Sequence, residues 1–92
     1  LNVLAAGQAQ LANLFASKRD EEHRFAELAY ETGITGAPLL AGTVATLDCR
    51  VCAAHEAGDH VIYVGEVVAS RCSQREPLVY WAGGYRSLAG PE

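Results

Sequence analysis

Leu47-Asp48-Cys49-Arg50-Val51-Cys52-Ala53 is a segment in which apolar and polar side chains alternate, and after a short turn the chain continues as His60-Val61-Ile62-Tyr63-Val64. Alternation is typical of a half-buried strand, so the first segment predicts a strand with Asp48 on its wet face. The second segment extends to about residue 69 with almost no polar face, which predicts a strand covered on both sides. Residues 55–59 favour a turn, so we expect the two strands to form a hairpin.

The flanking sequence predicts helices first and further strands later. Residues 2–4 are typical of a strand. Two sets of apolar residues then fall at helical spacing: Leu11, Leu14 and Phe15, followed by Phe25, Leu28 and Ala29. Residues 32–38 contain two glycines and a proline, which predicts a loop. Near the end of the chain, residues 78–81 predict a short strand, and Gly83-Gly84 predicts a bend. The expected order is therefore a strand, two short helices and an antiparallel meander.

Composition limits the class of protein. The 92 residues suffice for one small domain, and 50% of them are apolar while 20% are charged, as in a globular protein. The net charge of -4 argues against a nucleic-acid partner, which needs a clustered basic excess. The longest purely apolar stretch, residues 61–64, has the length of a strand and is too short to span a membrane.

The chain begins with Leu1 as though inside a strand, so we expect it to be a fragment or a processed form of a longer protein. Three cysteines cannot pair completely within one chain, and a reducing cytoplasm is the expected compartment.

Cys49 and Cys52 form a C-x-x-C motif, and His55, His60 and Cys72 lie nearby in sequence. This combination is compatible with a zinc site. In a strand, however, side chains three residues apart point to opposite faces, and the glycine-containing turn typical of such sites is missing. A redox role would require a helix N-terminus at the motif. The local sequence favours a structural role for both cysteines.

Three further clusters have both a structural and a functional interpretation. Gly58-Asp59-His60 suits a turn, with Gly58 at positive φ, but an imidazole at this position could also hydrogen-bond a ligand. Ser17-Lys18-Arg19 follows the first helix and is either a solvated turn or a phosphate contact made by side chains. The segment from Tyr80 to Arg86 is either an edge strand with a bend or an aromatic wall for a planar ligand.

Several segments occur in a characteristic order. They are Asn2-Val3-Leu4, Phe15-Ala16-Ser17-Lys18, Arg24-Phe25, Thr35-Gly36-Ala37-Pro38-Leu39-Leu40, Leu47-Asp48-Cys49-Arg50-Val51, His55-Glu56-Ala57-Gly58-Asp59-His60, Val64-Gly65-Glu66-Val67 and Tyr80 with Gly83-Gly84-Tyr85-Arg86. Together they resemble the flavin reductase family, the short-chain NAD(P)H:flavin oxidoreductases that serve two-component monooxygenases. The Gly-Asp-His and the Val-Gly-Glu-Val after it are the most specific part.

The resemblance implies a mainly β fold, a split β-barrel of the FMN-binding type with two short helices. Residues 1–92 would be the C-terminal portion of one such domain, lacking its N-terminal strands. It further implies FMN or FAD as cofactor, NADH or NADPH as cosubstrate, a homodimer, and a monooxygenase component as partner. His60 would be the catalytic residue that meets the nicotinamide. The implied cofactor-binding residues are Ser17, Lys18, Gly58, Asp59, His60, Tyr85 and Arg86.

Two other functions remain as alternatives. One is a non-catalytic flavin-binding or dimerisation module on the same barrel. The other is a structural zinc module that uses Cys49, Cys52 and a histidine.

Overall fold

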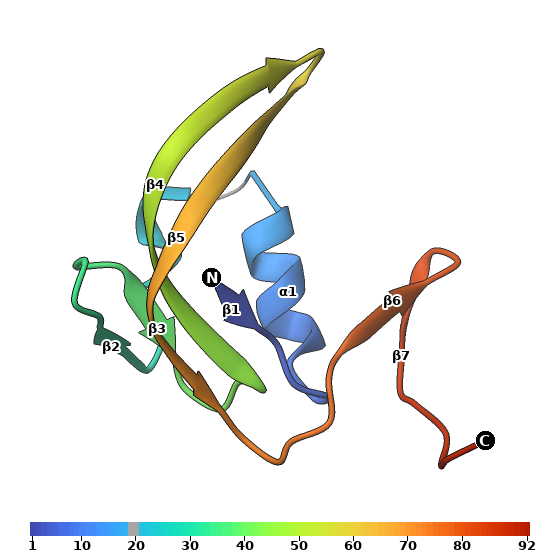
Figure 1. Cartoon of the computed structure of the whole chain (residues 1–92). Coiled ribbons are helices and arrows are strands. Elements are labelled where there is room, and N and C mark those ends of the chain that lie inside the picture. Colours follow the sequence, from blue (N-terminus) through green and yellow to red (C-terminus); the bar gives the residue numbers. More distant parts are fainter. Residues whose placement is uncertain (19–20) are drawn as a thin grey trace.

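The computed structural model describes residues 1–18 and 21–92 and shows a mainly β fold, as the sequence predicted (Figure 1). In chain order, the described elements are β1 (Asn2–Val3), α1 (Ala9–Ala16), the 3-10 helix η1 (Glu21–His23), β2 (Tyr30–Thr32), β3 (Pro38–Leu40), β4 (Ala45–Ala57), β5 (His60–Cys72), β6 (Val79–Trp81) and β7 (Gly84–Arg86). Strands β1, β4 and β5 form one antiparallel sheet in that order, while β2–β3 and β6–β7 are separate pairs. Neither described helix has the length and apolar character needed to cross a membrane.

The long β4–β5 hairpin dominates the fold and arches well beyond the other strands (Figure 1). Ala57 pairs with His60, so the turn consists of Gly58 and Asp59 alone and is shorter than the predicted 55–59. Gly58 has a φ of +65°, as expected, while Asp59 keeps a negative φ. This is the pattern of a type II′ turn, whose twist matches that of paired strands.

Two bulges bend the hairpin. Cys52 is an extra residue on β4, and Val68 is an extra residue on β5. A bulge bends its strand, increases the local twist and changes which face the following side chains occupy. The alternation of the sequence therefore cannot be carried along the whole hairpin without correction.

Burial along the hairpin contradicts two predictions. Asp48, expected on the wet face, is only 2% exposed, because the β2–β3 turn covers it and supplies hydrogen-bond donors. On β5, expected to be covered on both sides, Ile62 is 55% and Tyr63 67% exposed. The reason is that β5 pairs only with β4 among the described strands, so its outer half has no covering element in this part of the chain.

The helical prediction is confirmed for α1 and wrong for the second helix. Residues 21–29 form η1 and turns instead. Phe25 packs edge-on between Phe15 and Tyr30, with ring centroids 5.3 and 5.4 Å away. Phe25 thus belongs to an aromatic cluster at a turn and not to the apolar face of a helix. The expected loop is the turn between β2 and β3, which together form a hairpin that the sequence analysis missed.

Candidate functional site

The tip of the β4–β5 hairpin carries Gly58, Asp59 and His60. The His60 Nδ1 atom lies 2.7 Å from Asp59 Oδ1, and the two side chains are 81% and 94% exposed. Because a carboxylate only accepts hydrogen bonds, this contact places the proton of a neutral imidazole on Nδ1. Nε2 then carries the lone pair with which the ring can accept a hydrogen bond from a ligand.

The end of α1 brings Ser17 next to Arg24. Arg24 Nη2 donates a hydrogen bond to the Ser17 carbonyl, and the guanidinium lies over the Phe15 ring, 5.7 Å from its centroid. Arg24 Nη2 is also 3.6 Å from Glu21 Oε1. A cation at a helix C-terminus complements its unpaired carbonyls. Sequence reasoning assigned Arg24 no role, although its i,i+3 spacing from Glu21 was a usable signal.

Lys18 is exposed at the same end of the helix. It lines an open cleft of about 390 Å³ together with Glu21, Glu22 and His23. The carboxylates of this lining oppose an anion, so a phosphate here would depend on Lys18 and the neighbouring guanidinium. Arg19, which the sequence grouped with Ser17 and Lys18, lies outside the described residues.

The β6–β7 hairpin carries Tyr85 and Arg86. The Tyr80 and Tyr85 rings meet edge to face with centroids 5.2 Å apart, so they share one face of the hairpin. Arg86 Nη1 donates a hydrogen bond to the Tyr85 carbonyl at 3.2 Å. The two tyrosines therefore form a small aromatic surface on one face of the hairpin.

Within the described residues of one chain, the His60 turn and the β6–β7 hairpin do not form a single site. The hairpin tip and the β6–β7 hairpin lie well apart in Figure 1. Among the described residues, no hydrogen bond, ion pair or ring contact joins His60 to Tyr85 or Arg86. A ligand that touches both groups must therefore bridge them, or the groups must come from two copies of the chain.

Asp48, which the sequence analysis placed on the wet face of its strand, is a buried polar centre. Its Oδ1 accepts a hydrogen bond from the Thr35 hydroxyl, and its Oδ2 accepts one from the Thr35 backbone N–H at 3.1 Å. The hydroxyl bond is the largest cause holding the pKa of Asp48 below its usual 3.8, and burial opposes it. Asp48 also lines a cavity of about 260 Å³ between the β2–β3 turn and the base of β4 and β5. Its role is to fix that turn.

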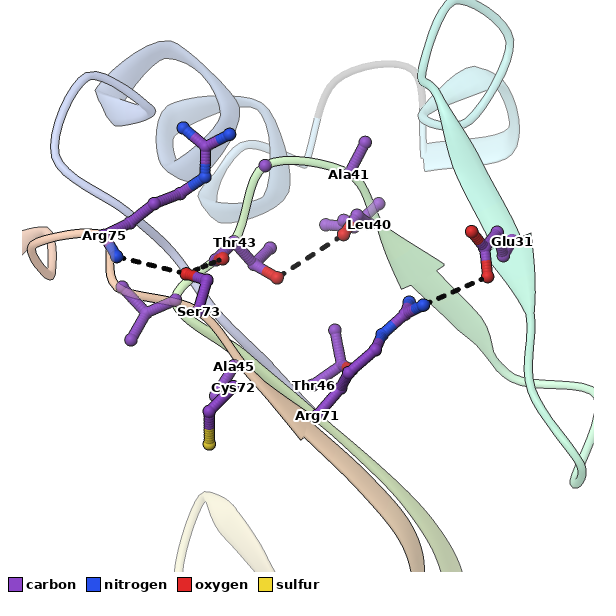
Figure 2. Close-up of a pocket in the computed structure, with 12 residues that line it drawn as sticks. Glu31, Leu40, Ala41, Thr43, Ala45, Thr46, Arg71, Cys72, Ser73 and Arg75 are labelled. Atoms are coloured by element: carbon purple, nitrogen blue, oxygen red, sulfur yellow. Dashed lines mark hydrogen bonds and ion pairs between the residues drawn. The ribbon is translucent and has the colours of Figure 1, made fainter.

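A second cleft, of about 330 Å³, lies where β3, β4 and β5 meet (Figure 2). It contains two arginines that the sequence analysis did not single out. Arg71 Nη1 reaches Glu31 Oε2 at 3.5 Å, whereas the Arg75 guanidinium points to the other side of the cleft. The two cations therefore do not converge on one point, and the geometry does not make an anion site.

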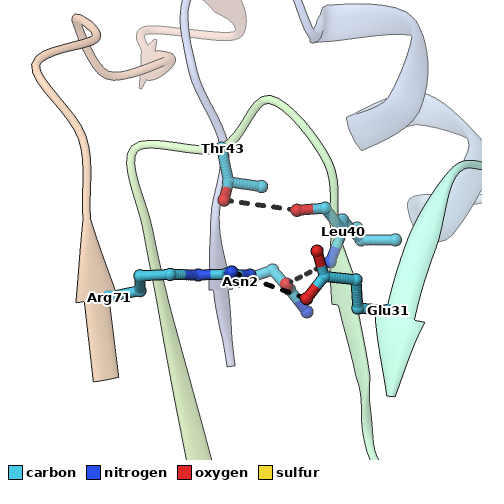
Figure 3. A network of polar contacts seen from close by, with 5 residues as sticks. All are labelled: Asn2, Glu31, Leu40, Thr43 and Arg71. Atoms are coloured by element: carbon cyan, nitrogen blue, oxygen red, sulfur yellow. Dashed lines mark hydrogen bonds and ion pairs between the residues drawn. The ribbon is translucent and has the colours of Figure 1, made fainter. Parts of the chain in front are cut away.

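Side chains around this cleft connect the separate sheets (Figure 3). Asn2 on β1 accepts a hydrogen bond from the Leu40 N–H at 2.9 Å and donates one to the Pro38 carbonyl at 3.2 Å, which ties β1 to β3. The Arg71–Glu31 pair ties β5 to β2. These polar contacts hold the separate sheets together, which packing in a larger apolar core would otherwise do.

The cysteines do not assemble a metal site in the described part of the chain, where no group of three or more His, Cys, Asp or Glu side chains is placed to hold a metal ion. Cys49 and Cys52 are free thiols whose Sγ atoms lie near the carbonyls of Leu47 and Val64, at 3.5 and 3.3 Å. Both therefore contact the backbone of their own hairpin.

Comparison with known proteins gives a consistent result. Residues 1–89 match the family model described as "Flavin reductase like domain". The chain is 41% identical over 91 residues to an FMN reductase (NADH), RutF, of Ancylobacter novellus, covering 98% of this chain and 50% of that protein. The chain thus spans about half the length of the curated relatives it matches.

Solved structures agree. The NADH:FAD oxidoreductase SgcE6 of Streptomyces globisporus is 36% identical, with a TM-score of 0.89 over 99% of this chain and 56% of that one. A homologue of nitrilotriacetate monooxygenase component B from Mycobacterium thermoresistibile is 27% identical, with a TM-score of 0.85 over 96% of this chain and 50% of that one.

Proposed function

This chain belongs to the flavin reductase family, and on that basis we propose that the protein carrying it transfers a hydride from NADH to a flavin, FMN or FAD. The observation that carries the proposal is the family match over residues 1–89, joined to relatives named as FMN reductase (NADH) and NADH:FAD oxidoreductase. NADPH is a less favoured cosubstrate, because both of these names specify NADH.

We propose that His60 contacts the nicotinamide. The Asp59 contact orients the ring and leaves Nε2 as an acceptor for a carboxamide N–H. When bound, the flavin supplies the hydride acceptor. The chain therefore has to bind and orient the two ring systems and to exclude water, and it need not provide a strong acid or base. An exposed imidazole held by its neighbouring carboxylate is suited to orientation, which is worth on the order of several kcal/mol in reactions between bound partners.

We propose Ser17 and Lys18 as flavin contacts, with Gly58 and Asp59 shaping the His60 turn. The residues present fit a flavin phosphate in part: Lys18 is exposed, and the Arg24 Nε atom beside the same helix end is buried and has no hydrogen-bond partner among the described residues. The acidic neighbours of Lys18 weaken the fit. Tyr85 and Arg86 are proposed contacts of the dinucleotide.

The assembly is part of the proposal. We propose that residues 1–92 are the C-terminal portion of one domain and that the protein is a cytoplasmic homodimer which supplies reduced flavin to a monooxygenase. The exposed apolar side chains of β5 support burial against further polypeptide. The separation of the His60 and Tyr85 groups within one chain supports a site shared by two copies. Sedimentation equilibrium should give twice the protomer mass, and a monomer would contradict the homodimer.

The direct test is NADH oxidation with added FMN, using the protein that carries this chain. His60→Ala should lower kcat/KM for NADH by about tenfold to 100-fold through lost orientation, while FMN affinity is retained. His55→Ala is the matched control, because His55 is an exposed histidine on the same hairpin, and it should leave turnover unchanged. An unaltered rate in His60→Ala would remove His60 from the site.

The second candidate is the non-catalytic flavin-binding or dimerisation module. The observation in its favour is that the His60 turn and the β6–β7 hairpin lie well apart in the described chain (Figure 1). A folded protein that binds FMN but oxidises no NADH would establish this module instead.

A further inference from the structure

Arg24 connects the end of α1 to the segment that follows it. Ser17 is the C-cap of the helix: its N–H still donates to the Asn13 carbonyl, while its ψ of 143° turns the chain out of the helix. The Ser17 carbonyl therefore lies outside the helical hydrogen-bond pattern, and Arg24 Nη2 donates a hydrogen bond to it. Because a helix leaves its last carbonyls without intrahelical partners, this bond fixes a group that would otherwise depend on water.

The Arg24 side chain is itself held in place. Its guanidinium lies over the Phe15 ring, 5.7 Å from the centroid, and Phe15 packs edge-on against Phe25, with ring centroids 5.3 Å apart. Glu21 Oε1 lies 3.6 Å from Arg24 Nη2, and the arginine side chain is only 21% exposed. A planar guanidinium can donate to a carbonyl and stack on a ring at the same time, which a lysine ammonium cannot do. Arg24 thus holds Ser17 from a fixed position.

The Ser17 carbonyl belongs to the same planar peptide unit as the Lys18 N–H. Because a peptide bond does not rotate freely, a donor that fixes the carbonyl also fixes the direction in which the chain enters Lys18. Lys18 is exposed and has a long side chain with many rotamers. Anchoring its backbone leaves only the side chain to be ordered when a ligand binds.

We propose that Arg24 is a positioning residue for the flavin phosphate: it holds the Ser17–Lys18 peptide so that the Lys18 ammonium meets the phosphate. The proposal rests on the proposed function, in which Ser17 and Lys18 contact the flavin, and adds a residue that acts through them. Arg24 acts through the backbone because its Nη2 is already engaged by the Ser17 carbonyl and Glu21.

The acidic surroundings make this placement important. Glu21 and Glu22 line the same open cleft as Lys18, and their carboxylates repel a phosphate. A lysine that moved freely would therefore attract the anion only in some of its positions. Holding the Ser17–Lys18 peptide in one orientation favours those positions, so Arg24 should increase the preference of the site for FMN over riboflavin, which lacks the phosphate.

Fluorescence titration with FMN and with riboflavin, in the protein that carries this chain, tests the proposal. Lys18→Gln should weaken FMN binding by about tenfold and leave riboflavin binding unchanged. Arg24→Lys keeps the charge but loses the planar fork, and it should weaken FMN binding by about fivefold, again without changing riboflavin binding. Because Arg24 acts through Lys18, Arg24→Lys in the Lys18→Gln background should have no further effect.

The ratio of the two flavin affinities separates positioning from stability, because a loss of folded protein weakens both flavins alike. Arg71→Lys is the matched control: Arg71 pairs with Glu31 at another cleft, and the variant should change neither affinity. Unchanged FMN affinity in Arg24→Lys would overturn the proposal, and so would an equal loss for FMN and riboflavin.

Additive effects of Arg24→Lys and Lys18→Gln would also overturn it, because they would make Arg24 an independent contact. A protein that shows the expected FMN-specific effects but oxidises no NADH would overturn the reductase function alone. An active reductase without those effects would overturn this inference alone.

Discussion

Asp48 accepts hydrogen bonds from Thr35 at both of its carboxylate oxygens, one from the hydroxyl and one from the backbone N–H. The pair joins the base of β4 to the β2–β3 turn across 13 residues of chain. A buried carboxylate with good donors can fix a turn in one geometry, since any other geometry would leave its oxygens unpaired. This contact has direct consequences for stability.

Acid should destabilise the fold through this pair. The Thr35 hydrogen bonds lower the folded-state pKa of Asp48 below the usual 3.8. The ionised carboxylate therefore stabilises the fold above the usual pKa, and this contribution is lost as the pH falls through the lower folded pKa. Thr35→Val should lower Tm near neutral pH and reduce its dependence on acid, measured by thermal melts from about pH 7 to about pH 2. Thr32→Val, at an exposed position of β2, is the control. Identical acid profiles would contradict the assignment.

Gly33 is required by the same contact. A Cβ atom there would lie 2.5 Å from Asp48 Oδ2, closer than van der Waals contact permits. Gly33→Ala should lower the free energy of unfolding by about 1–3 kcal/mol through overpacking, measured by urea denaturation. Gly90→Ala, whose Cβ would meet no atom within 4 Å, should change little. If both variants unfold alike, the turn moves more freely than the structure indicates.

The β6–β7 turn contains removable strain. Ala82 has a φ of +49° and Gly83 a φ of +80°, as in a type I′ turn. A residue with a Cβ atom is unfavourable at the first of these positions, so Ala82→Gly should raise stability by about 1 kcal/mol. Slower hydrogen exchange of the β6 and β7 amides would show where the gain arises. Gly83→Ala should act in the opposite direction, and a gain in that variant would contradict the turn assignment.

Arg24 should stabilise the end of α1. Its side chain is 21% exposed, donates to the Ser17 carbonyl and lies over Phe15. Arg24→Ala should lower the free energy of unfolding by about 1–2 kcal/mol through the lost hydrogen bond and ring contact. Glu21→Gln removes only the partly exposed ion pair and should change stability by less than about 0.5 kcal/mol. A larger effect of Glu21→Gln would make the ion pair the main contact.

Asp59 should act through His60. Because Asp59 Oδ1 holds His60 Nδ1, Asp59→Asn should lower NADH turnover by less than about tenfold, by loosening the ring without removing it. The effects of Asp59→Asn and His60→Ala on turnover should be non-additive, so Asp59→Asn in the His60→Ala background should have no further effect. Steady-state kinetics of the double-mutant cycle would show this, and independent effects would separate the two residues.

Much of the fold could be predicted because local patterns carry it. The alternation around Leu47 and the apolar run after His60 predicted β4 and β5, and Gly58 predicted their turn. The prediction of a second helix was wrong because the helical spacing of Phe25 and Leu28 has another cause. Phe25 packs in an aromatic cluster at a turn. The β2–β3 hairpin was missed because its strands are three residues each, too short for a period to show.

The sequence by itself determined the hairpin, α1, the family and the identity of the His60 motif, since all of these depend on residues close together in the chain. Only the tertiary structure decided that Asp48 is buried and that the outer half of β5 is exposed. Burial depends on which distant segment covers a strand, and two bulges change the faces that alternation assigns. Those are long-range relationships, and the spacing of neighbouring residues does not contain them.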